Sequence, residues 1–333
     1  MTAPRHRLES LAAALLDRDA EPAALARTAK DLYDLLSGLT GISERTVGKE
    51  LCSPIRLDTG VALAPRDAAR SVVDFMRTAR ILQGLDAAVA RAEQLFPRPV
   101  EVLYAGCGPF APFCLLLAAR RGPDAVRFTL LDVHAASLAA AVRAVAALGL
   151  EGSVRATVEA DATRYRHDGP LHVVMAEALE RALEREPQVA MTLNLAPQLA
   201  PGGFLVPERI LVEACLADPS REFAFDGQTA ERPRTVLGTV FDLSVEGARI
   251  LSGGVPPVTL SVPALAPGDP AELMLRTTID VFGPIALAEY ESGITYPAFR
   301  HELGRLRAGA RIDVGYRIGP QPGFTCTRVP SAG

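Results

Sequence analysis

The middle of the chain alternates short apolar runs with longer segments that have the spacing of helices. The runs are short enough for strands buried on both faces of a sheet, and they lie at Val100–Ala105, Val126–Leu131, Val154–Glu159, Val173–Ala176 and Phe204–Val206. Helices are expected between them, at Phe110–Arg121, Ala135–Leu148 and Gln188–Leu199. Strands that alternate with such helices predict a parallel sheet covered by helices on both faces. The centre of the chain is therefore predicted to be an α/β unit.

The regions on either side of this unit have a different pattern of apolar residues. Residues 7–39 and 66–96 carry apolar side chains at helical spacing, and the stretch between them is loop-like. After Pro207 come short β-type runs that predict an antiparallel sandwich or barrel, at Ile210–Cys215, Val236–Val245, Val258–Val262, Leu273–Val281, Ile312–Tyr316 and Phe324–Val329. We therefore expect an N-terminal helical cap over residues 1–62, an α/β core over 63–207 and a β domain over 208–333.

Composition and charge argue against several classes of function. The 333 residues carry a net charge of only −4, which favours neither nucleic acid nor a membrane surface as a partner. No apolar stretch reaches membrane length without a charge or a Pro/Gly break, and charges interrupt the apolar part of the N-terminus, so neither an anchor nor a signal peptide is expected. The five cysteines and five histidines are dispersed, which predicts free thiols, a cytoplasmic location and no metal site.

A glycine turn joins the first strand of the core to its first helix. Gly106, Cys107 and Gly108 directly follow the strand, and an apolar helical run comes after them. Glycines let the backbone approach a ligand closely, and the free amides of the helix end lie beneath it. The three turn residues are therefore candidate cofactor-binding residues. Cys107 and Cys114 are expected to be small core residues, not nucleophiles.

Acidic residues stand where three further strands of the sheet should end. Asp132 closes the second strand, where a carboxylate accepts the hydroxyls of a ribose. Asp161, with Ala162 beside it, follows the third strand and is placed to meet an adenine, and Glu177 follows the fourth, next to a reactive centre. His134 either lines the same pocket or stands on the surface at the start of a helix. Because ligands of open α/β sheets bind at the carboxyl ends of the strands, we expect these residues to share one site.

Two cofactors fit a glycine turn of this kind. Residues 106–111 match G-x-G-x-x-A, which dinucleotide enzymes also use, but Pro109 and Phe110 put bulk where a pyrophosphate needs room. S-adenosylmethionine has no phosphate. The order of motifs resembles class I S-adenosylmethionine-dependent methyltransferases, which implies a Rossmann-like fold and that cofactor, although Phe110 replaces the family's usual third glycine. The alternatives are an NAD-dependent oxidoreductase, a regulatory module that only binds the cofactor, and an aminocarboxypropyl transferase, since the turn is also similar to that of nicotianamine synthases.

Several segments together resemble protein arginine methyltransferases over roughly residues 66–330. The segment DFMRT at 74–78 is similar to the family's D-x-x-R-T helix, whose arginine, here Arg77, holds the carboxylate of the cofactor. The segment MAEALERALEREP resembles the loop with two glutamates nine positions apart, here Glu177 and Glu186. PGGFLVPER and LRAGARIDVGYRI resemble the entry strand and a terminal hairpin of the family's β-barrel.

Paired carboxylates suit a guanidinium, because this planar cation stays protonated and takes bidentate hydrogen bonds. The resemblance therefore implies that Glu177 and Glu186 are the catalytic pair, which would aim one acceptor nitrogen at the sulfonium methyl group. The alternative is that Glu177, Glu180 and Glu184 form the solvated face of a helix with nearby arginines.

The chain also departs from the family pattern. The family's Thr-His-Trp segment has no counterpart, the nearest stretch being Gly293–Pro297, and His301 is a candidate substitute for the missing histidine. The helical arm of the family's dimer is short or missing, because Val236–Val245 leads straight into more β-type sequence. We therefore expect a small-molecule or peptide acceptor with a guanidino or amino group, and we keep a homodimer as an expectation.

Overall fold

The computed structural model describes residues 3–224, 232–251, 254–266 and 268–330. Within these ranges a parallel sheet has the strand order β5-β4-β3-β6-β7. Its strands are β3 (Val100–Ala105), β4 (Val126–Asp132), β5 (Val154–Glu159), β6 (Val173–Ala176) and β7 (Phe204–Val206). The helices between them are α6 (Pro112–Arg121), α7 (Ala135–Leu148) and α8 (Gln188–Leu195). The predicted α/β alternation is confirmed. The strand order reverses beside β3, and such a switch point is where open α/β sheets bind ligands.

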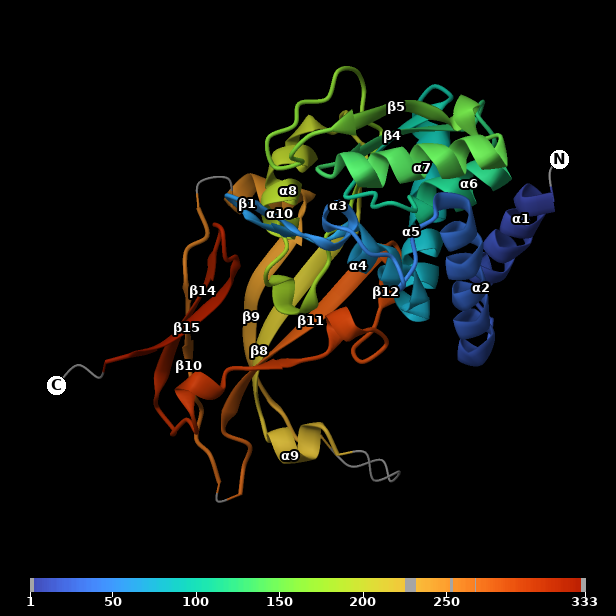
Figure 1. Ribbon diagram of the computed structural model, residues 1–333. Coiled ribbons are helices and arrows are strands. Elements are labelled where there is room, and N and C mark those ends of the chain that lie inside the picture. Colours follow the sequence, from blue (N-terminus) through green and yellow to red (C-terminus); the bar gives the residue numbers. More distant parts are fainter. Residues whose placement is uncertain (1–2, 225–231, 252–253, 267, 331–333) are drawn as a thin grey trace.

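Helices of the N-terminal region pack on the helices of the core (Figure 1). They are α1 (Ala3–Leu16) and α2 (Pro22–Thr40), which contact α5 (Phe75–Leu95), α6 and α7. Phe110 of the glycine turn is fully buried, and its ring meets that of Tyr33 of α2 at 5.8 Å between centroids. The Phe110 side chain therefore anchors the N-terminal helices to the core.

The stretch predicted to be loop-like contains small elements of its own. They are α3 (Lys49–Cys52) and an antiparallel hairpin of β1 (Ile55–Leu57) and β2 (Gly60–Ala62). The helical segment predicted over residues 66–96 is divided into α4 (Pro65–Arg70), a 3₁₀ turn and α5. Asp74 caps α5, since its side chain accepts a hydrogen bond from the Arg77 amide at 3.3 Å.

Helix α5 connects the parallel sheet with the β-rich C-terminal region. It contacts β6 and β7 on one side and β11 (Glu272–Phe282) and β12 (Ile285–Leu287) on the other. A Cβ atom added at Gly84 would lie 2.3 Å from Cγ1 of Val281 in β11, so only glycine permits this close approach. The position of Arg77 at the start of α5 is thus fixed from both sides.

The C-terminal strands form two antiparallel sheets in the described ranges. One contains β8 (Arg209–Ala217), β9 (Thr235–Ser244), β11, β12 and β13 (Ala298–Phe299), and the other contains β10 (Val258–Ser261), β14 (Arg311–Arg317) and β15 (Gly323–Val329). Each predicted β-type run overlaps one of these strands, and only Val245 and Val262, at the ends of two runs, lie outside them. Closure into a barrel or sandwich, and the division into three domains, stay predictions.

Two helices interrupt the β-rich region, which the sequence prediction missed. The short helix α9 (Pro219–Glu222) follows β8, and α10 (Val245–Leu251) follows β9 directly. The prediction that Val236–Val245 leads straight into more β-type sequence was therefore wrong. Helix α10 packs against α8 and β9, and that tertiary contact outweighs the weak helical signal of a seven-residue segment. None of the helices in the described ranges is long and apolar enough to cross a membrane.

Candidate active site

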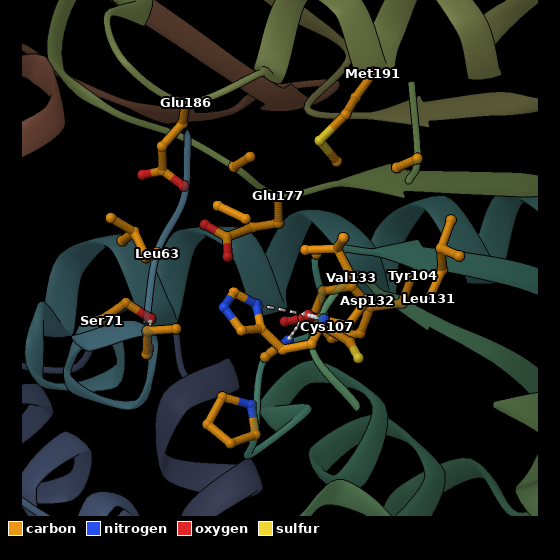
Figure 2. A pocket seen from close by; sticks show the side chains of 18 of the residues that line it. Leu63, Ser71, Tyr104, Cys107, Leu131, Asp132, Val133, Glu177, Glu186 and Met191 are labelled. Carbon is orange, nitrogen blue, oxygen red and sulfur yellow. Dashed lines mark hydrogen bonds and ion pairs between the residues drawn. The ribbon is translucent and has the colours of Figure 1, made fainter. Parts of the chain in front are cut away.

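A pocket opens at the carboxyl ends of the central strands, with an empty volume of about 850 Å³ that includes space open to solvent. All nine residues predicted for cofactor binding or catalysis line it: Arg77, Gly106, Cys107, Gly108, Asp132, Asp161, Ala162, Glu177 and Glu186. Several of them are labelled in Figure 2. The structure thus brings the predicted residues together, while their roles stay predictions.

The glycine turn approaches the end of β6 so closely that a side chain has no room. Gly106 has a φ of 77°, and a Cβ atom there would lie 2.6 Å from the carbonyl oxygen of Glu177. Gly108 has a φ of 61°, and its amide donates a hydrogen bond to Asp132 Oδ2 at 2.8 Å. The turn is therefore held between the acids that end β4 and follow β6.

Asp132 organises the turn around it. Besides the Gly108 amide, its carboxylate accepts the His134 amide at 2.8 Å, and the residue is buried. His134 is also buried and lines the pocket, so the surface position weighed for it was wrong. Its Nε2 has no partner among the described residues. The sequence correctly predicts that His134 stands at the start of a helix. It does not predict that other parts of the chain cover this helix end and bury the side chain.

The loop after β5 presents Asp161 and Ala162 to the same pocket. The Asp161 carboxylate accepts both the amide and the hydroxyl of Thr163 at 2.8 Å. Asn194 of α8 donates to the Ala162 carbonyl at 2.9 Å. These bonds fix the loop, and the backbone and apolar surface of Ala162 face the cavity together with the aspartate.

The β1–β2 hairpin covers the pocket, and no candidate residue was predicted there. Leu57, Ala62 and Leu63 line the cavity. At one end Asp58 pairs with Arg164 at 2.5 Å, next to the Asp161 loop. At the other end the Val61 amide donates to the Arg185 carbonyl at 2.8 Å, next to Glu186. The segment IRLDTGVAL has two short β-type runs on either side of an Asp-Thr-Gly turn. This pattern is typical of a β-hairpin and could have been used to predict it.

Arg77 and Glu177 form a buried ion pair at the floor of the site. Arg77 Nη2 donates to Glu177 Oε1, and both side chains are largely shielded from solvent. Burial alone lowers the pKa of the Arg77 guanidinium, but the carboxylates of Glu177, Glu186 and Asp74 outweigh it and raise that pKa. A single guanidinium therefore stands among three carboxylates, and the nitrogen atoms that do not bind Glu177 are free to take a further anion.

The segment between the two glutamates is an irregular loop with a strained backbone. Ala182, Leu183 and Arg185 have positive φ angles of 54°, 54° and 64°, which non-glycine residues adopt at a cost. Only a 3₁₀ turn interrupts the loop, at Arg181–Leu183. The alternative of a solvated helical face was therefore wrong, because Glu177 and Glu180 are not one helical turn apart.

Contacts from three parts of the chain hold this loop in place. Gln188 of α8 bridges the Ala176 carbonyl and the Ala178 amide, at 3.0 and 2.8 Å. Tyr316 of β14 donates its hydroxyl to the Leu183 carbonyl at 2.6 Å. The β1–β2 hairpin contacts the backbone at Arg185. Such a strained loop persists because its surroundings determine it from several sides.

Glu186 lies beside the Arg77–Glu177 pair and forms no salt bridge of its own with the part of the chain that the structure describes. Figure 2 shows the side chains of Glu177 and Glu186 next to one another. Burial raises the pKa of Glu186 to about 8, with Glu177 and Glu180 acting in the same direction and Arg77 and Arg185 opposing them. At neutral pH the Glu186 carboxyl is thus mostly protonated, and a cation that binds beside it would favour its ionised form.

The titration of Glu186 predicts a measurable dependence of stability on pH. Because its pKa is about 8 in the folded chain against 4.5 ordinarily, the folded state holds a proton that the unfolded state releases between these pH values. The free energy of unfolding therefore falls as pH rises from about 4.5 to 8. Glu186→Gln should remove this contribution and raise the free energy of unfolding at pH 8.5 by roughly 1–3 kcal/mol over the wild type, with little difference at pH 4.5.

Chemical denaturation at the two pH values measures this effect. Glu151→Gln, at an exposed position outside the pocket, is the control and should behave as the wild type at both. An equal effect of Glu186→Gln at pH 4.5 and pH 8.5 would contradict the raised pKa.

The segment after β12 approaches the site from the β-rich region. Ser292 donates its hydroxyl to Asp74 Oδ2 at 2.5 Å, which ties this segment to the cap of α5. His301 is elsewhere: its side chain is 69% exposed and pairs with Glu272 at 3.0 Å. The suggestion that His301 replaces the family's barrel histidine was therefore wrong, because the intervening strand β13 carries it away from the pocket.

The cysteines have the environment of core residues. The five thiols are unpaired, and Cys107 and Cys114 are buried. Burial raises the pKa of both thiols, and for Cys107 the charge of Asp132 adds to this effect. A thiol kept protonated is a poor nucleophile. Among the described residues no group of three or more His, Cys, Asp or Glu side chains is placed to hold a metal ion.

The fold is that of an α/β protein with a pocket at the carboxyl ends of its parallel strands, and solved structures give a comparison. The chain is similar to PRMT1 of Trypanosoma brucei, reported as an enzyme–prozyme heterotetramer with AdoHcy, with 13% identity over 75% of this chain and 94% of that one and a TM-score of 0.47. It is also similar to protein arginine methyltransferase 10 of Arabidopsis thaliana, in an open conformation, with 11% identity over 72% of this chain and 84% of that one and a TM-score of 0.49. No family profile and no curated protein sequence matches the chain.

This likeness is to the family that the sequence motifs resemble. At such identities and TM-scores it carries no information on the roles of individual residues in this chain.

Proposed function

We propose that the chain is an S-adenosylmethionine-dependent methyltransferase that methylates a guanidino or amino group of a small molecule or peptide. The observation that carries the proposal is the convergence of Arg77, Glu177 and Glu186 at one end of a pocket whose other walls are the glycine turn, Asp132 and the Asp161 loop. Four carboxylates and one guanidinium at the ends of the strands suit a ligand that has both an anionic and a cationic end.

The residues present fit this cofactor. The Arg77 guanidinium uses one nitrogen for Glu177 and would hold a carboxylate with the others. Asp132 and Asp161 would take the ribose and the adenine, while the hairpin residues Leu57 and Leu63 give the apolar cover that a nucleoside needs. When bound, the cofactor supplies a methyl group on a positively charged sulfur.

The glutamate pair would bind and orient the acceptor. Glu186 forms no salt bridge with the described residues, although the charges of Arg77 and Arg185 act on it, so a cationic nitrogen group is the partner that would ionise its carboxyl and be held by it. Glu177 is fixed by Arg77 and limits the positions that the acceptor nitrogen can take. Transfer forms a nitrogen–carbon bond as a sulfur–carbon bond breaks, and the proton leaving the nitrogen would go to one of these carboxylates or to solvent.

Cofactor binding is the first test of the proposal. Calorimetry should detect S-adenosylhomocysteine binding, and Asp132→Ala should weaken it by roughly 1.5–3 kcal/mol, because the buried carboxylate both meets the ribose and holds the Gly108 amide. Asp124→Ala, at an exposed position before β4 that does not line the pocket, is the control. Tight NAD binding with no response to S-adenosylhomocysteine would reject the proposal.

The products separate the remaining alternatives. Incubation with S-adenosylmethionine and candidate acceptors, starting with free arginine and other guanidino compounds, should yield S-adenosylhomocysteine. Methylthioadenosine in its place would mean aminocarboxypropyl transfer, and neither product would mean a binding module or an untested acceptor class. A cytoplasmic location and a homodimer remain expectations.

A further inference from the structure

The β1–β2 hairpin lies directly on the backbone of the loop that carries Glu186. A Cβ atom added at Gly60, the first residue of β2, would lie 2.7 Å from the carbonyl oxygen of Arg185 and 3.2 Å from the carbonyl carbon of Glu186. The Val61 amide donates a hydrogen bond to the same Arg185 carbonyl at 2.8 Å. Backbones this close leave no room for a side chain between them. The hairpin therefore closes the pocket beside Glu186.

The β-rich region also packs on this loop. The Arg185 amide donates to the Pro322 carbonyl at 3.3 Å, in the turn before β15. A Cβ atom added at Gly323 would lie 3.2 Å from Cγ of Glu184, and Glu184 pairs with Arg300 at 2.8 Å. The residues just before Glu186 are thus held between the hairpin and the C-terminal strands.

The start of α5 is joined to the β-rich region in the same way. Ser292 donates to Asp74 at 2.5 Å, and the 3₁₀ turn at Gly293–Thr295 contacts the one at Arg181–Leu183. The described residues that line the pocket all lie between positions 57 and 191, so none of them comes from the β-rich region. That region covers the glutamate loop from outside and gives no wall of the pocket to an acceptor.

We propose that the acceptor is a small molecule with a guanidino or amino group, and that the β1–β2 hairpin excludes the same group when it belongs to a polypeptide. This inference rests on the proposed function and narrows its acceptor to one class. A side chain of a polypeptide brings its backbone with it, and that backbone needs a groove leading to the glutamates. The hairpin and the turn before β15 both contact the loop beside Glu186 and leave no such groove there.

Two conjugates of the cofactor test this inference. In both, a nitrogen replaces the sulfur of S-adenosylhomocysteine and carries a short alkyl arm that ends in a guanidinium. The far nitrogen of the guanidinium bears a methyl group in the compact conjugate, whereas in the extended conjugate it belongs to the arginine of a blocked Gly-Arg-Gly peptide. Calorimetry on the wild type should show the compact conjugate binding about tenfold to a hundredfold tighter than S-adenosylhomocysteine, the scale of hydrogen bonds to a charged group. The extended conjugate should bind no tighter than S-adenosylhomocysteine.

A matched pair of glycine variants tests the hairpin as the barrier. Gly60→Ala adds a methyl group that has no room against the loop, so the hairpin must move away from it. This variant should bind the extended conjugate roughly threefold to tenfold tighter than the wild type does. Gly48→Ala adds the same group at a φ of 118° with no atom within 4 Å, and it should leave both affinities unchanged.

The outcomes separate the inference from the proposed function. An extended conjugate that binds the wild type as tightly as the compact one overturns the inference while the proposed function stands. A preference for the compact conjugate that Gly60→Ala leaves unchanged overturns the assignment of the barrier to the hairpin. If neither conjugate binds the wild type tighter than S-adenosylhomocysteine does, the glutamates hold no cation, and the proposed function fails together with the inference.

Discussion

Replacing Glu186 by glutamine is expected to lower turnover by about 30-fold to several hundredfold, with S-adenosylhomocysteine affinity within about threefold of the wild type. The substitution keeps the shape of the side chain and removes a carboxylate that forms no salt bridge with the described residues. A cationic acceptor would then face one carboxylate, already engaged with Arg77, in place of two. The expected loss corresponds to roughly 2–4 kcal/mol of transition-state stabilisation.

The same loop provides the control for this prediction. Glu180→Gln changes an equivalent charge that pairs with Arg185 at 3.0 Å and does not line the pocket, so its turnover should stay close to that of the wild type. Glu177→Gln should lower turnover as Glu186→Gln does. Steady-state rates and calorimetry on the three variants measure both quantities. A silent Glu186→Gln together with an impaired Glu180→Gln would contradict the assigned pair and favour an acceptor without a positive charge.

Replacing Arg77 by lysine is expected to weaken S-adenosylhomocysteine binding about tenfold to a hundredfold. Lysine keeps the charge but has no planar fork, so it cannot hold Glu177 and a ligand carboxylate at the same time. Methylthioadenosine, which has no carboxylate, should lose much less affinity. The difference between the two ligands is the measurement that separates a clamp for the carboxylate from a general loss of structure.

A second arginine of the same helix is the matched control. Arg91 of α5 is exposed, and among the described residues its side chain bonds to Gln94 alone, at 2.7 Å, so Arg91→Lys should leave both affinities as they are. Unchanged binding of S-adenosylhomocysteine to Arg77→Lys would mean that Arg77 is structural and serves to hold Glu177.

The sequence alone determined the course of the α/β unit and the residues that meet in its pocket. Buried parallel strands are short, continuous apolar runs, so β3, β6 and β7 begin and end at the predicted residues. The more exposed edge strand β5 also has the predicted bounds. Strand ends of a parallel sheet lie along one edge, and this simple geometry brings Asp132, Asp161 and Glu177 together however the rest of the chain folds.

Tertiary structure alone decided how these residues are held and which charges they have. The hairpin β1–β2 and the strained loop before Glu186 have little local signal, because their backbone is fixed by contacts with residues more than a hundred positions away. The pKa of Glu186 and the pairing of Arg77 with Glu177 depend on burial and on the approach of α5 to β6, which no spacing in the sequence records. Local patterns specify elements and strand ends, whereas the protonation state and the partner of a charge arise only when distant parts of the chain exclude water around it.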